Sequence, residues 1–303
     1  MSIVPTDVPM TPELADSLVD RLAAEYPFLR AETLASTAYG RPIRTLTIGT
    51  GGRRVLYSAA HHANEWLTAT VLLKFAEDYA EAIRTGGMIG GVSAEELSGA
   101  ATISLVPMVN PDGVALVTGA ATPEEQEQAR ELSRNYPNIP FPDGWKANVR
   151  GVDLNLQYPA AWEQAREIKF AQGYTRPAPR DYVGTEPLTQ PEARAMVRLT
   201  ELCSPDRILA YHTQGQVIYP QFKDFDPPDS MPIAWRLAAA SGYDVEPTPP
   251  ESAAAGYKDW FIQTYNRPGY TIEAGKGVSP LPLEDFDSIY AANLPIMVLT
   301  AVL

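Results

Sequence analysis

The stretch from Tyr57 to Trp66, YSAAHHANEW, joins the end of an apolar segment to the beginning of an amphipathic one. The segment before it, Arg53 to Ala60, follows the turn signal Gly51-Gly52 and is predicted to be a strand. The segment after it, Thr68 to Ile83, carries apolar residues at helical spacing and is predicted to be a helix with one buried face. The polar residues of the stretch therefore lie where a strand ends and a helix begins.

Strands and helices alternate along the rest of the chain. Ile43 to Ile48 alternates with period two, and the Gly51-Gly52 turn joins it to Arg53 to Ala60, which predicts a hairpin. Other segments predict strands at Ile103–Val109, Arg207–Tyr211 and Tyr270–Ile272, and helices at Thr122–Arg134, Pro191–Leu202 and Phe286–Val302. The pattern predicts one α/β domain over residues 1–303, with a lead-in of about residues 1–25. We expect a mixed, mainly parallel sheet with helices on both faces.

Composition and charge exclude several classes of function. Hydrophobic residues make up 45% of the 303 residues, which is enough for a substantial core. The net charge of −13 disfavours binding to a nucleic-acid backbone or an anionic membrane, so neither is expected as a partner. No signal peptide and no run of about 20 apolar residues is present, which predicts a cytoplasmic enzyme. Composition leaves the oligomeric state open, and Cys203, the single cysteine, forms no intrachain disulfide.

All three histidines of the chain follow predicted strands directly. His61 and His62 come after the strand in the stretch quoted above, and His212 comes after the strand that begins at Arg207. Glu273 follows the strand Tyr270–Ile272 in the same way. Because ligands bind beyond the carboxyl ends of strands in α/β sheets, these side chains are expected to meet in one site.

His62 and Glu65 lie three residues apart on a predicted first helical turn, so both side chains point the same way and suit one metal ion. Together with His212 they form a ligand set that leaves one position open for water, as catalytic zinc requires. A bare H-x-x-E pattern is also common by chance, with the histidine ending a strand and the glutamate favouring a helix N-terminus. His61 is a competing ligand, but the residue three positions later is Asn64, a poor one.

Five phrases in order resemble the zinc carboxypeptidase superfamily, and within it the bacterial branch of γ-D-glutamyl-diamino acid endopeptidases, which act on peptidoglycan peptides. The phrases are HHANEW (61–66), VNPDG (109–113), WKANVRGVDLNLQYP (145–159), HTQGQ (212–216) and TIEAGKG (271–277). The resemblance runs from about residue 26 to the C-terminus. It implies a zinc carboxypeptidase-like fold and a hydrolase with one Zn²⁺ ion per chain.

The resemblance implies a role for each of seven residues. They are the metal ligands His62, Glu65 and His212, the general base Glu273, the oxyanion-steadying Arg150, the substrate-binding Asn155, and Asp153, which orients the first zinc histidine. In this mechanism zinc lowers the pKa of water to about 7. Glu273 takes the proton and delivers it to the leaving amine, while Arg150 offsets charge on the carbonyl oxygen.

One position departs from the family pattern. Carboxypeptidases of this superfamily follow the asparagine with an arginine that clamps the free C-terminal carboxylate, and here Leu156 stands at that position. A leucine forms no such pair. The departure favours an endopeptidase on cell-wall peptides over a simple exopeptidase.

Three residues are candidates for substrate recognition. Lys258 lies 15 residues before Glu273, in the region that the resemblance assigns to the pocket for the residue after the cleaved bond. It is predicted to meet a carboxylate such as that of diaminopimelate, or else to be a solvated surface lysine. Lys276, next to the base, is a weaker candidate for the same role. Gln214, after His212, either lines the cleft or satisfies loop backbone groups.

The sequence therefore predicts a zinc metallopeptidase that hydrolyses a peptide or γ-glutamyl amide bond, with a peptide or muropeptide as its substrate partner. The preferred bond is γ-D-Glu–diaminopimelate in peptidoglycan-derived peptides. Two alternatives stay open: a zinc carboxypeptidase or small-molecule deacylase on the same scaffold, and a non-catalytic muropeptide-binding homologue. Bound zinc separates an enzyme from the metal-free binding protein.

Overall fold

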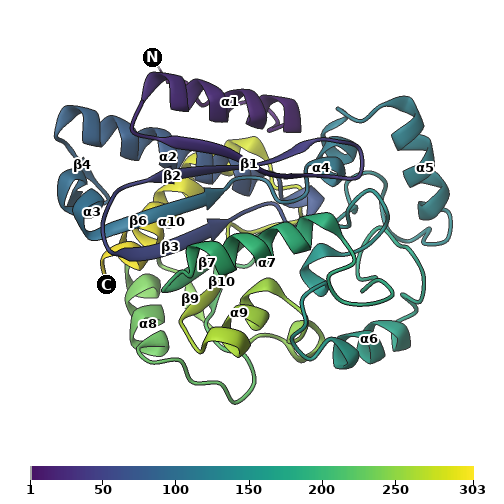
Figure 1. Cartoon of the computed structure of the whole chain (residues 1–303). Helices are drawn as coiled ribbons and strands as arrows, with labels where there is room; N and C mark the ends of the chain where they lie inside the picture. The colour runs from purple at the N-terminus through teal and green to yellow at the C-terminus, as the bar shows by residue number, and fades with distance from the viewer. Residues whose placement is uncertain (1) are drawn as a thin grey trace.

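The main sheet has eight strands of mixed direction, and four of them form a parallel run at its centre (Figure 1). The computed structural model describes residues 2–303. In spatial order the strands are β1 (Arg30–Ser36), β2 (Pro42–Ile48), β6 (Ala101–Val106), β3 (Arg53–Ser58), β7 (Arg207–His212), β10 (Gly269–Glu273), β8 (Val217–Tyr219) and β9 (Asp244–Val245). β6, β3, β7 and β10 are parallel to one another, which confirms the predicted mainly parallel sheet. A separate hairpin joins β4 (Met88–Ile89) to β5 (Val92–Ser93).

Helices cover both faces of the sheet, as the sequence predicts (Figure 1). Residues of α1 (Pro12–Glu25), α2 (Leu67–Thr85), α3 (Ala94–Ala100), α8 (Ser230–Ser241) and α10 (Phe286–Val302) share the larger core with one face. Residues of α7 (Pro191–Cys203) and α9 (Tyr257–Tyr265) share a second core with the other face. The remaining helices are α4 (Pro111–Thr118), α5 (Pro123–Ser133) and α6 (Trp162–Ala171). None of the helices in residues 2–303 is long and apolar enough to span a membrane.

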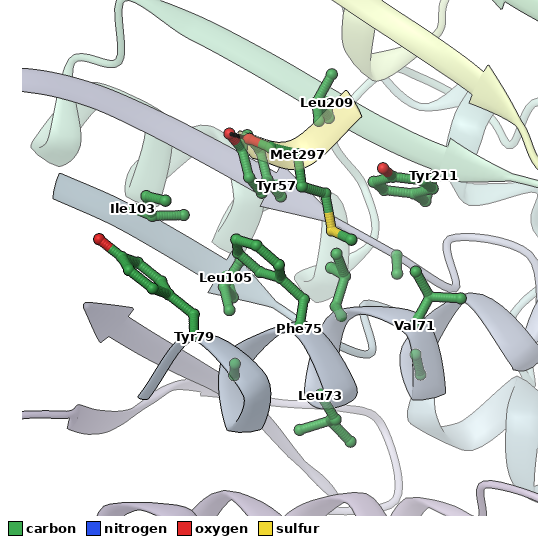
Figure 2. Packing of buried hydrophobic residues seen from close by; sticks show 14 of the residues in the cluster. Tyr57, Val71, Leu73, Phe75, Tyr79, Ile103, Leu105, Leu209, Tyr211 and Met297 are labelled. Carbon is green, nitrogen blue, oxygen red and sulfur yellow. Dashed lines mark hydrogen bonds between the residues drawn. The ribbon is translucent and has the colours of Figure 1, made fainter. Parts of the chain in front are cut away.

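Helix α2 is held against the sheet by large apolar side chains on one side of it. Phe75 and Tyr79 pack toward Ile103 of β6 and Tyr57 of β3 (Figure 2). Tyr57 also donates a hydrogen bond to the carbonyl oxygen of Met297 in α10 at 2.6 Å. Each fully buried side chain of this kind contributes about 1.5–3 kcal/mol. This core fixes the strand-to-helix junction that contains His62.

The predicted hairpin between the second and third strands is wrong. β6 lies between β2 and β3, antiparallel to the first and parallel to the second. The Gly51-Gly52 segment does turn the chain, but it turns onto α3: the amide nitrogens of Thr50 and Gly51 both donate to the carbonyl oxygen of Ser98. A Cβ atom at Gly51 would lie 2.0 Å from the backbone of Ala100, so the turn needs glycine for this close contact.

The other predicted elements are present with ends shifted by a few residues. The predicted helices Thr68–Ile83, Thr122–Arg134, Pro191–Leu202 and Phe286–Val302 correspond to α2, α5, α7 and α10. α1, which the sequence pattern did not predict, lies inside the proposed lead-in and buries Leu18 and Leu22 in the larger core. Its packing ties the first residues to α2 and β2. The assignment of residues 1–303 to one domain stays a prediction.

Glu192, in the first turn of α7, is a buried carboxyl group outside the predicted site. Neither of its oxygens has a hydrogen-bond partner within residues 2–303. Burial, assisted by the negative charge of Asp112, raises the pKa of Glu192 to about 7. Because the folded state holds the proton more tightly than the unfolded state, the stability that this proton contributes is present below about pH 4.5 and is lost as the pH rises through 7.

Glu192→Gln removes this titration and keeps the shape of the side chain. We expect the stability of the variant relative to wild type to rise by on the order of 2–3 kcal/mol between pH 4.5 and pH 8. Urea unfolding at both pH values measures the change. Glu201→Gln, at an exposed position of the same helix, is the matched control and is expected to show no such trend. An equal stability difference at the two pH values would contradict the assignment.

Candidate metal centre and substrate cleft

Three parallel strands bring the predicted site residues to one edge of the sheet. His212 is the last residue of β7, Glu273 is the last residue of β10, and the two are direct neighbours in the strand register. His62 follows β3, which pairs with β7 on its other side, and Glu65 ends a short 3₁₀ turn, Ala63–Glu65. Parallel neighbours end at the same edge, so residues far apart in sequence meet there.

The ligand atoms of His62, Glu65 and His212 gather around one point. Glu65 Oε1 lies 2.9 Å from His62 Nδ1, Glu65 Oε2 lies 2.8 Å from His212 Nδ1, and the two Nδ1 atoms are 3.2 Å apart. Zinc bonds of about 2.0–2.1 Å at tetrahedral angles separate two ligand atoms by about 3.3 Å. Two imidazole nitrogens and a carboxylate at these separations therefore fit a single tetrahedral zinc ion with one position left open.

Asp153 lies within hydrogen-bond distance of His62. Its Oδ1 accepts a hydrogen bond from His62 Nε2 at 3.1 Å, which leaves Nδ1 as the nitrogen that faces Glu65 and His212. Its Oδ2 accepts from the backbone nitrogen of Asp181 at 3.1 Å. Although burial opposes ionisation, His62 and the hydrogen bonds hold the pKa of Asp153 well below its usual range. The carboxylate thus fixes both the tautomer and the orientation of the ligand.

His61, the competing ligand, points elsewhere. Its Nε2 lies 3.1 Å from the hydroxyl of Tyr158, and its ring stacks on Tyr257. Asn64, the residue that would have to assist it, donates to the carbonyl oxygen of Asp143. The structure therefore brings His62, and not His61, to the metal centre.

Glu273 faces the metal centre across a cavity of about 140 Å³ that both share. Burial, reinforced by the negative charge of Glu65 and opposed by His212, raises the pKa of Glu273. A carboxylate in this position accepts protons more readily than one in water, which suits a general base. Asn155 and Leu156 line the same cavity, so the position next to the asparagine carries no cation.

Arg150 does not lie in the site. It is exposed at the tip of a tight turn in which the backbone nitrogens of Arg150 and Val152 both donate to Asn148 Oδ1. Its positive charge acts to lower the pKa of Tyr39 and of Glu192, against the larger effect of burial. This geometry contradicts the predicted oxyanion role, because the side chain does not line the cavity.

Lys146, and not Arg150, is the basic residue of the WKANVRGVDLN phrase that lines the metal cavity. Its Nζ lies 2.8 Å from Glu65 Oε1 and lines the cavity with Glu273. Its carbonyl oxygen accepts from the backbone nitrogen of Ala63, which fixes the lysine beside the metal-binding turn. Sequence reasoning missed it although it lies in the same phrase, WKANVRGVDLN, because two basic residues there are equally compatible with the pattern.

Lys258 is buried, so the alternative of a solvated surface lysine is wrong. Only 3% of the residue is exposed, and its Nζ donates to the carbonyl oxygen of Gln221 at 2.6 Å. It also lies 2.6 Å from Asp259 Oδ1. The pair lines a pocket of about 120 Å³ that also contains Asn155 and Glu273.

The other two substrate candidates are differently placed. Gln214 is exposed and lines a large cleft of about 1000 Å³, which Lys146 also lines. Lys276 is exposed and makes no hydrogen bond or ion pair within the described residues 2–303. It lines neither the metal cavity nor the pocket of Lys258. The structure thus favours Gln214 as a cleft residue and gives Lys276 no such position.

Three contiguous hollows make up the substrate cleft. The metal cavity shares Asn155, Ser252 and Glu273 with the pocket of Lys258. It shares Lys146, Lys169, Arg180 and Asp181 with the large cleft, and Ser252 lines all three hollows. A substrate whose reacting bond lies at the metal therefore extends in two directions, toward Lys258 and toward Arg180.

Comparison with known proteins agrees with this geometry. Residues 15–290 match the family model described as zinc carboxypeptidase. The chain is 43% identical over 278 residues to γ-D-glutamyl-L-diamino acid endopeptidase 1 of Lysinibacillus sphaericus. The aligned region covers 92% of this chain and 68% of that protein.

Two solved structures share the fold. Carboxypeptidase A of Helicoverpa armigera superposes with a TM-score of 0.71 at 19% identity, covering 98% of this chain and 73% of that one. The murein-tripeptide amidase MpaA of Escherichia coli O157 superposes with a TM-score of 0.54 at 18% identity. The superposition covers 89% of this chain and 91% of that one. These likenesses agree with the observed fold. The chain belongs to the zinc carboxypeptidase family and is a zinc-dependent metallopeptidase.

Proposed function

We propose that the protein hydrolyses the amide bond between γ-D-glutamate and a diamino acid, such as diaminopimelate, in peptidoglycan-derived peptides, with one zinc ion per chain. The observation that carries this proposal is the buried Lys258–Asp259 pair in the pocket beside Glu273. The name of the Lysinibacillus sphaericus relative, which acts on γ-D-glutamyl-L-diamino acids, supports the same substrate class. So does the murein-tripeptide amidase that shares the fold.

The reaction consumes one water molecule. A zinc ion held by His62, Glu65 and His212 supplies Lewis acidity, which lowers the pKa of water to about 7 and polarises the carbonyl group. Glu273 accepts the proton of the water as the oxygen bonds to the carbonyl carbon. It then delivers this proton to the amine nitrogen as the carbon–nitrogen bond breaks. The products are a free γ-carboxylate and the amine of the diamino acid.

Lys146 is placed to steady the negative charge that develops on the carbonyl oxygen. Its ammonium group lies in the same cavity as Glu273 and is held there by Glu65. Charge placed before the reaction begins stabilises the transition state without reorganisation of solvent. We assign to Lys146 the role that the sequence analysis gave to Arg150.

The pocket of Lys258 suits the far end of diaminopimelate. That end carries an ammonium and a carboxylate group together. In the pocket these groups meet Asp259 and Lys258, which exchange part of their contact with each other for contacts with the substrate. A diamino acid without the second carboxylate, such as lysine, uses only Asp259. Leu156 agrees with this assignment, because it provides no arginine to bind the α-carboxylate of the residue after the cleaved bond.

Mass spectrometry after incubation with L-Ala-γ-D-Glu-meso-diaminopimelate tests the proposal. We expect release of free diaminopimelate and of L-Ala-D-Glu, and no cleavage of ordinary dipeptides with a free C-terminus. Cleavage of the ordinary dipeptides at a similar rate would instead support a carboxypeptidase. A protein that binds the tripeptide without zinc and without turnover would support the non-catalytic homologue.

Lys258→Gln tests whether Lys258 binds the second carboxylate of diaminopimelate. We expect kcat/KM for the diaminopimelate peptide to fall about 10- to 100-fold, since a hydrogen bond to a charged group contributes roughly 1.5–3 kcal/mol. The matching lysine peptide is expected to change little and also reports that the variant folds. Lys276→Gln, an exposed lysine near the cleft, serves as control. Equal kinetics of Lys258→Gln and wild type on both peptides would refute the role.

A cytoplasmic location stays a prediction of the sequence. The expected lack of nucleic-acid and membrane partners rests on the net charge of −13 and stays a prediction as well.

A further inference from the structure

A cluster of three cations forms the wall between the metal cavity and the large cleft. Lys146 comes from the loop that carries the WKANVRGVDLN phrase, Lys169 from the last turn of α6, and Arg180 from the loop before α7. In a chain with a net charge of −13, such a gathering of positive charge in a cleft is unusual. Of the three, the function described above uses only Lys146.

Asp181 holds two of these cations in place. Its Oδ1 lies 2.6 Å from Lys169 Nζ, and its Oδ2 lies 2.7 Å from Arg180 Nε. Its own backbone nitrogen donates to Asp153, the residue that orients His62. Asp181 adopts a φ of 65°, in the left-handed region that non-glycine residues rarely enter. The cluster is therefore built onto the support of the metal centre and is not a chance meeting of surface side chains.

Arg180 has hydrogen-bonding capacity to spare. Asp181 engages only its Nε, and within residues 2–303 its two terminal nitrogens have no protein acceptor. Lys169 is buried with 6% exposed. One carboxylate thus serves two cations, which leaves a surplus positive charge and a free pair of N–H donors at the cleft. A planar guanidinium group with two free donors matches a carboxylate in a bidentate pair.

The position of the cluster indicates which part of a substrate it meets. The metal cavity is continuous with both the pocket of Lys258 and the large cleft, and the three cations line the cavity and the cleft but not the pocket. If the diamino acid occupies the pocket of Lys258, the acyl group of the reacting amide extends toward Arg180. A γ-linked glutamyl group differs from an ordinary α-linked residue here, because it keeps a free α-carboxylate. Three carbon atoms, Cα, Cβ and Cγ, separate this carboxylate from the reacting carbonyl carbon.

We propose that Arg180, supported by Lys169 and Asp181, binds the free α-carboxylate of the γ-linked glutamyl group on the acyl side of the reacting bond. This inference rests on the proposed function and adds a specificity residue to it. The site selects γ-glutamyl amides because an α-linked peptide places no main-chain carboxylate at this distance. It also discriminates against glutamyl groups whose α-carboxylate is amidated.

Two matched peptides test the proposal: L-Ala-γ-D-Glu-meso-diaminopimelate and the same peptide with the α-carboxylate as a carboxamide. We expect wild type to prefer the acid about 10- to 100-fold in kcat/KM, the range of a charge-assisted hydrogen-bonded pair. Arg180→Gln is expected to lose this factor on the acid and to leave the amide nearly unchanged. Arg176→Gln, an exposed arginine of the same loop, is the control and keeps the wild-type preference.

A binding measurement gives a readout apart from turnover. By isothermal titration calorimetry, Arg180→Gln is expected to weaken binding of L-Ala-D-Glu about 10-fold or more and to leave its α-carboxamide analogue unchanged. Equal losses on acid and amide, or no loss on either, would overturn the inference. Wild-type cleavage of both peptides at the same rate would overturn it and leave the proposed function standing, whereas cleavage of neither would remove both.

Discussion

Glu273→Gln is expected to keep the zinc ion and to lose hydrolysis by about 10³- to 10⁴-fold. Glutamine has the size of the native side chain but accepts no proton at neutral pH, so the water is not deprotonated and the amine leaves without a proton. Glu273 is the last residue of β10 and is not one of the three candidate metal ligands. The metal centre of the variant therefore keeps its full ligand set. Steady-state kinetics and metal analysis of the same preparation measure both effects.

Glu246→Gln is the matched control, because Glu246 is an exposed glutamate just beyond β9. It is expected to retain wild-type kcat. Turnover of Glu273→Gln within 10-fold of wild type would show that another group takes the proton. Loss of zinc along with activity would instead place Glu273 in the metal's ligand set.

His212→Ala is expected to abolish both zinc binding and hydrolysis. The imidazole provides one of three ligand atoms, and its removal leaves two, which is fewer than catalytic zinc sites use. We expect metal content well below one equivalent and a loss of kcat greater than about 10⁴-fold, because the water is no longer activated. Inductively coupled plasma mass spectrometry and kinetics measure the two quantities.

Dialysis of wild type against a chelator provides the reversible form of the same test. Activity is expected to disappear and to return on addition of zinc in wild type but not in His212→Ala. His61→Gln is the matched comparison, since His61 lies beside the site and bonds to Tyr158. It is expected to retain zinc. Loss of zinc in His61→Gln together with its retention in His212→Ala would exchange the two assignments.

The candidate ligand set was predicted from local signals together with the resemblance to the zinc carboxypeptidase superfamily. His62 and Glu65 lie three residues apart, and His212 and Glu273 each end a short apolar strand. Strand ends in a parallel sheet meet at one edge whatever their distance along the chain. The converging site therefore follows from strand prediction alone, before any pairing is known.

Strand pairing was less predictable. Period-two alternation identifies β2 and β3 as strands but carries no information about their neighbours, and the glycine turn between them suggested a hairpin. The partner of both is β6, which comes more than forty residues after β3 in the chain. Contacts over such a distance depend on the packing of α2 and α3, which no short pattern records.

The cationic side of the cleft was the hardest part to predict. Arg150 and Lys146 share one phrase, and only the turn at Asn148 decides which of them points inward. Arg180 and Asp181 come from a proline-rich loop without periodicity, so no pattern marks them as neighbours of the metal centre. Their positions result from tertiary contacts with Asp153.

The central claim is that His62, Glu65 and His212 together hold a catalytic zinc ion. Anomalous diffraction from crystals of protein purified without chelator, recorded on both sides of the zinc absorption edge, tests it most directly. We predict a single strong peak at about 2.0–2.2 Å from His62 Nδ1, His212 Nδ1 and a carboxylate oxygen of Glu65. An active preparation with no peak among these atoms, or with its zinc elsewhere, would contradict the claim.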